Sequence, residues 1–231
     1  MDPEAKALDY HDVLLRQGDV QLLAGPHWLN DQVIAFFFEY LQREVAAGAG
    51  VLLVSPDSTY LLASLGPDAG PAVVLEPRGF AAARLVLLAV NNNPDVERAG
   101  GGSHWSLLAY SAARNSFHSY DSMAGSNRQA ARAVYKAAAA AAPPGARFVE
   151  ERAPQQANGY DCGVHVLAVA KLLCQRAAAA EGSSGQGISM AVSPKEVTPA
   201  AVTVLRQEVL ELIRSKMAAA AAGAAGGKCG S

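Results

Sequence analysis

Cys162 is the residue of this chain best suited to covalent chemistry. It follows the loop sequence Gln155-Gln156-Ala157-Asn158-Gly159-Tyr160-Asp161, in which Asn-Gly marks a tight turn, and it opens an apolar stretch that predicts a helix. Backbone amides and the dipole at a helix start favour the thiolate, which is the nucleophilic form of cysteine. A small buried hydrophobe is the competing interpretation of a lone cysteine, and position alone does not separate the two.

A cysteine nucleophile needs a base, and the base needs an orienting partner. His104 begins a predicted strand after a glycine-rich loop, and Asp121 closes the next strand. If the two strands form an antiparallel hairpin around Arg114-Asn115, their outer ends meet. Asp121 then accepts a hydrogen bond from one imidazole nitrogen of His104 while the other nitrogen faces Cys162. The remaining histidines fit this role less well, and the last of them is interpreted as a core histidine with satisfied hydrogen bonds: His11, His27, His118 and His165.

Gln156, at the mouth of the loop before Cys162, is a candidate for stabilising negative charge. Its side-chain amide could donate to an oxyanion together with the backbone N–H of Cys162. A solvated loop glutamine is the plain alternative, and Gln155 is a competing candidate.

A single α+β domain over residues 1–217 must position these groups, with a flexible low-complexity insertion at 177–197 and a disordered Ala/Gly-rich tail at 218–231. Residues 8–25 are expected to be irregular, and 51–83 are weakly patterned. Helices are expected from Asn30 or Asp31 to about residue 45, over 127–142, from Cys162 to Cys174 and from Thr198-Pro199 onward, with strands over 84–90, 104–110, 116–121 and 147–150.

Composition excludes several classes of function. The 231 residues carry 19 Lys+Arg and 21 Asp+Glu, so a nucleic-acid-binding stripe is not expected. No apolar run reaches the roughly 18 residues of a membrane-spanning helix, and the N-terminus lacks a signal-peptide pattern, which predicts a cytoplasmic or nuclear protein. Cys174 and Cys229 are the other two cysteines, and the odd count without a C-x-x-C pair argues against disulfides and a zinc site. No metal or organic cofactor is expected.

Taken together, the pattern H-W, D and Q-x-N-x-x-D-C-G resembles the Ulp/sentrin-specific protease family of ubiquitin-like-modifier proteases, and in particular its deneddylase branch. The stretches that carry the resemblance are Leu14-Leu15-Arg16-Gln17-Gly18-Asp19-Val20, Trp28-Leu29-Asn30-Asp31, Gly101-Gly102-Ser103-His104-Trp105-Ser106-Leu107-Leu108, Asn115-Ser116-Phe117, Tyr120-Asp121-Ser122 and Tyr160-Asp161-Cys162-Gly163.

The resemblance implies a papain-like cysteine protease fold, with the nucleophile on a central helix packed against a small mixed or antiparallel sheet. It implies a triad of Cys162, His104 and Asp121, with Gln156 in the oxyanion hole.

The same resemblance assigns substrate-binding residues. Trp28 and Trp105 would enclose the Gly-Gly tail of a modifier, because only glycine, which lacks Cβ, passes between two rings at contact distance. Asn30 and Asp31 would also bind substrate, Asp31 through the tail backbone or a basic residue on it. Core packing and a first-turn helix carboxylate are the plain alternatives for these residues.

The implied activity is cleavage after the Gly-Gly of the neddylation modifier, by deconjugation from lysines of partners such as cullins, by precursor processing, or both. The same chemistry on SUMO or ubiquitin is an alternative within the protease class. An acyltransferase with the same triad and a catalytically idle modifier-binding module are the alternatives from other classes. The Ala-rich helix 128–142 and the loop from Asn91 to Ser103 depart from the family in composition, which bears on the choice of modifier.

Overall fold

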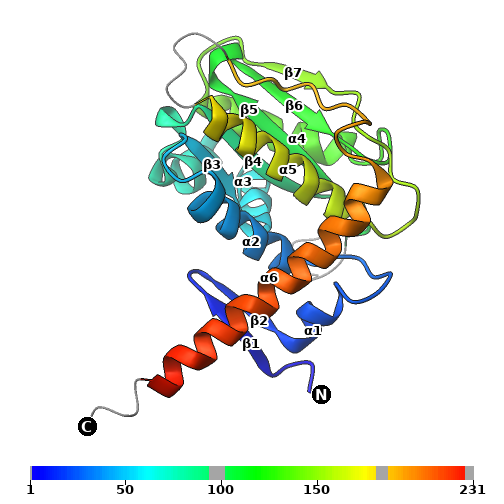
Figure 1. Cartoon of the computed structure of the whole chain (residues 1–231). Coiled ribbons are helices and arrows are strands. Elements are labelled where there is room, and N and C mark those ends of the chain that lie inside the picture. The colour runs from blue at the N-terminus through cyan, green and yellow to red at the C-terminus, as the bar shows by residue number, and fades with distance from the viewer. Residues whose placement is uncertain (1, 94–101, 181–186, 227–231) are drawn as a thin grey trace.

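A five-stranded mixed sheet forms the centre of the protein (Figure 1), whose computed structural model describes residues 2–93, 102–180 and 187–226. The three central strands are antiparallel neighbours, and each edge strand runs parallel to the strand beside it. The four strands predicted from the sequence are all present, including the short edge strand over residues 147–150. In spatial order the strands are β3 (Val51–Val54), β4 (Leu85–Asn91), β5 (Trp105–Ser111), β6 (Ser116–Tyr120) and β7 (Arg147–Glu150).

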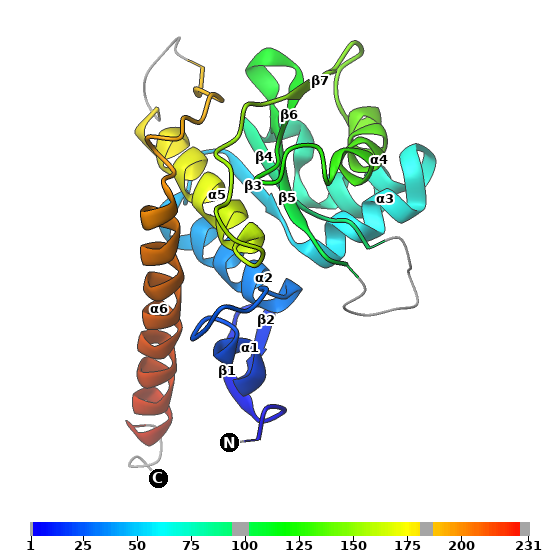
Figure 2. The same ribbon diagram turned by 90° about the vertical axis from the view of Figure 1, so that its right-hand side faces the viewer.

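Both faces of this sheet are covered, which explains why β4 is apolar at nearly every position. Side chains alternate across a strand, so Leu85, Leu87 and Ala89 enter one hydrophobic core while Val86 and Leu88 enter the other. Figure 2 shows the two helical layers on opposite sides of the strands. The first layer holds α2 (Asp31–Tyr40) and α5 (Cys162–Ala179), and the second holds α3 (Pro56–Gly70) and α4 (Arg128–Ala138).

The predicted helices at 31, 128 and 162 are all present. Asn30 caps α2 by accepting a hydrogen bond from the Val33 amide, and a π-helical turn, Leu41–Val45, continues the helix. The helix α5 is buried along most of its length. It is the one described helix that is long and apolar enough to span a membrane by length and composition, and a buried core helix meets the same criterion.

Residues 8–25, expected to be irregular, are instead an ordered hairpin followed by a short helix. β1 (Lys6–Tyr10) pairs with β2 (Val13–Arg16) in a two-stranded antiparallel sheet, and α1 (Gln17–Gln21) follows. Val13 and Leu15 are buried while Leu14 between them is exposed, so the alternation visible in the sequence is that of a half-buried strand.

The weakly patterned segment 51–83 forms β3, α3 and three short helical turns. Gly66, with φ of 69°, breaks α3 just before Pro67. This break interrupts the helical spacing of apolar residues, so the helical pattern of the segment is weak in the sequence. The turns are Pro71–Leu75, Glu76–Arg78 and Phe80–Ala82, and two others, Ala112–Arg114 and Ala139–Ala141, lie further along the chain.

Two expectations of disorder were wrong for the described residues. Within the insertion at 177–197, Ile188, Met190 and Val192 are buried in the main core, and the Tyr120 hydroxyl donates to the Met190 carbonyl. The last helix, α6 (Pro199–Gly226), continues past residue 218 into the segment predicted to be disordered. Its Thr198 cap, which accepts from the Ala201 amide, confirms the predicted helix start. Cys229 lies outside the described residues.

The end of α6 provides a test of which residues stabilise the fold. Residues 218–222 are exposed, whereas Val209, Leu210 and Ile213 are buried in the core. Deletion from residue 218 onward should change the free energy of unfolding by no more than about 0.5 kcal/mol, as for other exposed surface. Deletion from Val209 onward should prevent stable folding. Urea unfolding of both truncated proteins measures this, and a loss of several kcal/mol in the shorter deletion would contradict it.

Candidate active site

His104 and Asp121 meet at one end of the β5–β6 hairpin, as predicted. Leu107 on β5 pairs with Tyr120 on β6, so the residue before β5 lies near the residue after β6. His104 Nε2 is 2.6 Å from Asp121 Oδ1. The turn that closes the hairpin ends at Asn115, whose left-handed φ of 42° is one that Asn tolerates better than most residues.

Asp121 is fixed by more than the histidine. Oδ1 also accepts from the backbone N–H of Met123, at 3.0 Å, and Oδ2 accepts from that of Asn127, at 2.9 Å. Burial favours the neutral acid, but the bonds from His104 and from these two amides outweigh it and lower the pKa of Asp121. The carboxylate is therefore ionised and aimed at the imidazole.

The pKa of His104 is raised from 6.5 to about 9. Burial opposes the charged imidazolium, but Asp121, and after it the Cys162 sulfur, favour that form more strongly. Nε2 is bonded to Asp121, and Nδ1 has no nitrogen or oxygen partner among the described residues. Nδ1 is thus the atom available to exchange a proton with Cys162.

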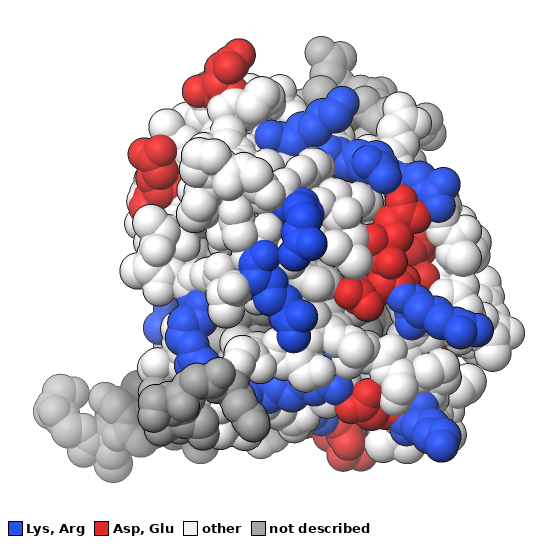
Figure 3. All heavy atoms as spheres, turned by 90° about the horizontal axis from the view of Figure 1, so that it is seen from above, with Lys and Arg blue, Asp and Glu red and all other residues white. Residues whose placement is uncertain are grey.

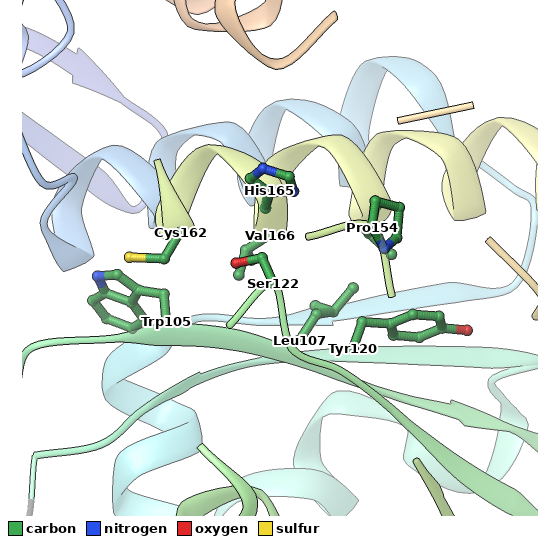
Figure 4. A pocket seen from close by; sticks show the side chains of 9 residues that line it. Trp105, Leu107, Tyr120, Ser122, Pro154, Cys162, His165 and Val166 are labelled. Carbon is green, nitrogen blue, oxygen red and sulfur yellow. The ribbon is translucent and has the colours of Figure 1, made fainter. Parts of the chain in front are cut away.

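Cys162 is the first residue of α5, as the sequence indicated, and only 2% of its surface is exposed. It borders a cavity with about 10 Å³ of room for water (Figure 4), too small for a peptide. Cys174, further along α5, is fully buried, and burial raises the pKa of its thiol to about 12, as expected of a core residue.

Both tryptophans lie near Cys162 or the loop that precedes it. Trp105 is buried beside Cys162 in the cavity, and its Nε1 donates to the Leu29 carbonyl at 2.9 Å. Trp28 is 51% exposed, and its Nε1 donates to the Gly159 carbonyl at 2.6 Å. A Cβ at Gly163 would lie 2.9 Å from Leu29 Cβ, so glycine is required for this close approach. Contact of the two rings with a modifier tail stays a prediction.

The structure distinguishes the two candidate glutamines. Gln155 Nε2 donates to the carbonyls of both Asp121 and Ala153, which uses both of its hydrogens. Gln156 Nε2 donates to the Asn158 carbonyl only, at 2.6 Å, so within the described structure one N–H remains for another acceptor. Gln156 is therefore the better candidate for the oxyanion donor.

Asn30 and Asp31 both take part in the first turn of α2. The Asn30 side chain caps the helix and donates to Asp19, so its amide serves the fold. Asp31 accepts from the Gln32 amide and lies near Asp57, whose pKa is raised first by burial and then by Asp31. Substrate contact by either residue stays a prediction.

A Ser–His–carboxylate arrangement lies on β6 and directly after the end of β7. His118 Nε2 is 2.9 Å from Ser116 Oγ, and His118 Nδ1 is 2.7 Å from Glu151 Oε1. Ser116 is only 1% exposed and is paired with Ser111 on one side and Arg147 on the other. Because Ser116 is almost fully buried, this group is not accessible to a substrate in this structure.

His165 departs from its prediction. It lies on α5 and is buried as expected, but its Nδ1 has no hydrogen-bond partner in the part of the chain that the structure describes. Burial lowers the pKa of its imidazole, so this side chain is neutral at pH 7.

Arg206 on α6 is an important positioning residue that the sequence analysis missed. Its Nε and Nη2 donate to Asp161 Oδ1 at 3.0 and 2.7 Å, and both residues are 5% exposed. Nη1 donates to the carbonyls of Leu22 and Gly25, and Nη2 to that of His27. The feature of the sequence that could have indicated this role is the position of Arg206 on the apolar face of a predicted helix, directly after Leu205.

Asn127 was also missed. Besides its amide contact with Asp121, its buried Nδ2 donates to the Val90 carbonyl and to Ser106 Oγ. It therefore joins β4, β5 and the carboxylate. Within the described ranges no group of three or more metal-ligating side chains occurs.

The raised pKa of His104 predicts a titration. The imidazole should lose its proton near pH 9 in the wild type, and in Asp121→Ala nearer its ordinary value of 6.5, because the partner that favours the charged form is gone. The pKa of His104 is higher in the folded than in the unfolded protein, so protonation of His104 stabilises the fold. This stabilisation is complete below pH 6.5 and is lost as the pH rises through about 9. NMR of the ring nitrogens measures the midpoint, and an unchanged midpoint in Asp121→Ala would contradict the assignment.

The Arg206 network predicts a large effect on stability. Arg206→Ala leaves Asp161 buried without its ion pair, which should cost about 3–5 kcal/mol of unfolding free energy. Arg214→Ala, an exposed arginine on the same helix, is the matched control and should change it by no more than about 0.5 kcal/mol. Equal effects of the two substitutions in urea unfolding would show that the buried pair has no special role.

Comparison with known proteins agrees with this geometry. A model described as the Ulp1 protease family, C-terminal catalytic domain, matches residues 80–183. NEDD8-specific protease 1 of Arabidopsis thaliana is 36% identical over 214 residues, which cover 92% of this chain and 94% of that protein. Sentrin-specific protease 8 of Homo sapiens is 43% identical over 180 residues, covering 76% and 83%.

Among solved structures, the C-terminal Ulp1 protease domain in complex with Smt3, the yeast ortholog of SUMO, has a TM-score of 0.64. The match covers 92% of this chain and 88% of that chain at 19% identity, which is a likeness of fold. The α+β fold predicted from the sequence, with a cysteine-bearing central helix against a small sheet, is confirmed. The chain belongs to the Ulp1 protease family of cysteine proteases.

Proposed function

We propose that this protein cleaves the bond after the C-terminal Gly-Gly of NEDD8, releasing it from lysine conjugates or from its extended precursor. The observation that carries the chemistry is the 2.6 Å contact of His104 with Asp121, which leaves Nδ1 of a readily protonated imidazole for Cys162 at the start of α5. Support for the modifier comes from the name of the Arabidopsis relative, a NEDD8-specific protease.

The first half of the reaction is acyl transfer to sulfur. The Cys162 thiolate attacks the carbonyl carbon of the last glycine, and the carbonyl electrons move to oxygen. The backbone N–H of Cys162 and the free N–H of Gln156 stabilise this oxyanion. As the C–N bond breaks, the His104 imidazolium gives its proton to the departing lysine amine, and a thioester remains.

The second half is hydrolysis of the thioester. Neutral His104 takes a proton from a water molecule, whose oxygen attacks the thioester carbon. Collapse of this second intermediate breaks the C–S bond and restores the thiolate–imidazolium pair; the glycine leaves as a carboxylic acid, which gives its remaining proton to solvent. Asp121 holds the ring orientation and stabilises the imidazolium throughout.

Selection of a Gly-Gly tail follows from the surroundings of Cys162. Trp105 is buried beside the sulfur and Trp28 is exposed next to the same loop, so a narrow tail without side chains fits between them best. The carboxylates of Asp31 and Asp57, which interact with each other, would favour a basic residue further up the tail. Cullins, implied as conjugates by the family resemblance, are the proposed substrates.

SUMO is the second candidate modifier. Its support is the likeness of fold to the Ulp1 domain in complex with Smt3. The sequence identity of this match is lower than that to the NEDD8-specific relative, so NEDD8 is preferred.

Probes with an electrophile at the C-terminus of NEDD8, SUMO or ubiquitin test the proposal directly. Labelling of the wild type by the NEDD8 probe is expected, with none in Cys162→Ala and normal labelling in the matched control Cys174→Ala. Cleavage of a NEDD8–lysine isopeptide should fall by roughly a thousandfold or more in Cys162→Ala, while binding of NEDD8 persists.

Other outcomes decide against specific parts of the proposal. Faster labelling by the SUMO or ubiquitin probe would support the proposed protease activity and contradict the choice of NEDD8 as the modifier. If none of the probes labels Cys162, the proposed protease activity is wrong. Tight NEDD8 binding would then favour the idle module, and acetylation of a partner would favour the acyltransferase.

A further inference from the structure

The small cavity beside Cys162 has polar groups that the proposed reaction does not use. Figure 4 shows Cys162 and His165 near one another on α5, with Ser122 and Trp105 across from them. Leu107, Tyr120, Pro154, Val166 and Val169 complete the walls. Two side chains, His165 and Ser122, can therefore form hydrogen bonds within an otherwise largely apolar space.

His165 needs a partner in this space. It is 5% exposed, and its buried Nδ1 has no hydrogen bond to any residue that the structure describes. A buried polar atom that is left without a hydrogen-bond partner destabilises the fold. The cavity offers about 10 Å³ of room, which is close to what one water molecule needs.

Ser122 connects the same cavity to Gln156. Its backbone carbonyl accepts from the Gln156 amide at 2.9 Å, and its Oγ donates to Gln156 Oε1 at 2.8 Å. The second bond determines which end of the side-chain amide faces the serine. If the amide turned over, its oxygen would face the reacting carbonyl and repel the developing negative charge.

We propose that one water molecule occupies this cavity, held between His165 Nδ1 and Ser122 Oγ, and that His165 and Ser122 act through it as positioning residues for Gln156. The proposal rests on the proposed role of Gln156 as oxyanion donor. Neither residue touches the substrate.

The hydrogen bonds have a consistent direction. The Ser122 hydroxyl hydrogen is used by Gln156, so Oγ can only accept from the water. Neutral His165 either donates to the water or accepts its second hydrogen, according to its tautomer. Each bond in such a chain polarises the next, so electron density is drawn from Gln156 Oε1 and its remaining N–H becomes a better donor to the oxyanion.

Substitutions at the two ends of the chain test this. Ser122→Ala should lower kcat for NEDD8 isopeptide cleavage about tenfold, part of the 10²–10³ that loss of a whole oxyanion donor costs, with KM within about twofold. His165→Leu should lower kcat by roughly threefold or more. His165→Asn, which keeps a polar atom near the position of Nδ1, is the matched control and should retain most of the wild-type kcat.

A double-substitution experiment separates positioning from general damage to the fold. In a Gln156→Ala background, neither Ser122→Ala nor His165→Leu should lower kcat further, because both act through the missing amide. Losses that multiply in the double variants, or a rise in KM without a fall in kcat, would overturn the proposal.

The water itself is tested without any activity. A high-resolution crystal structure of the wild type should show density for one water within hydrogen-bond distance of His165 Nδ1 and Ser122 Oγ, absent in His165→Leu. A dry cavity in the wild type would overturn the proposal even if NEDD8 is cleaved. Density for the water in a wild type that cleaves no modifier would instead keep the water site and overturn the proposed function together with the positioning role.

Discussion

The ion pair between Arg206 and Asp161 is the interaction on which the catalytic arrangement depends. It joins three segments that are distant in sequence: the last helix, the loop that precedes Trp28, and the residue directly before Cys162. The negative charge of the buried Asp161 carboxylate would disfavour a negative charge on the neighbouring Cys162 sulfur. The Arg206 guanidinium offsets the carboxylate charge by donating to one carboxylate oxygen. It also donates to three backbone carbonyls of the loop. The ion pair therefore balances the charge of Asp161, and the helix dipole of α5 can still favour a negative charge on the Cys162 sulfur.

A second constraint acts from the sheet. Because β5 and β6 are antiparallel neighbours, His104 and Asp121 are brought together by backbone pairing, and the contacts of Asn127 with the carboxylate, with β4 and with β5 hold that end of the sheet closed. The nucleophile belongs to a helix and its base to a strand, so their relative position depends on how α5 packs on β5. Gly163 and Trp105, which both contact Leu29, set that packing.

Sequence reasoning predicted the secondary structure and the contact of His104 with Asp121 more reliably than the other contacts of the site. The strands, the helix starts at Asn30 and Thr198 and the meeting of His104 with Asp121 followed from local patterns and from strand pairing, which are properties of neighbouring residues. Whether His165 has a hydrogen-bond partner, and which groups bind Arg206, depends on elements far away in sequence, so no local pattern indicates whether a buried polar atom is satisfied. Disorder was overpredicted at residues 187–197 and 218–226, since Ala-rich and Ser-rich composition also suits packed coil and helix.

Gln155 and Gln156 differ in how their side-chain amides are used, which bears on the proposed role of Gln156 as oxyanion donor. They are adjacent and identical in type, yet Gln155 spends both amide hydrogens on backbone carbonyls while Gln156 keeps one. Ser122 and Asn158 hold Gln156 at its oxygen and at its other hydrogen, so the remaining N–H has a fixed direction. A donor that is already oriented does not have to reorganise as charge develops, which is the condition under which an oxyanion hole is most effective. The hydrogen-bond donors of the proposed oxyanion hole are thus oriented before substrate binds, beside a cysteine that is almost fully buried.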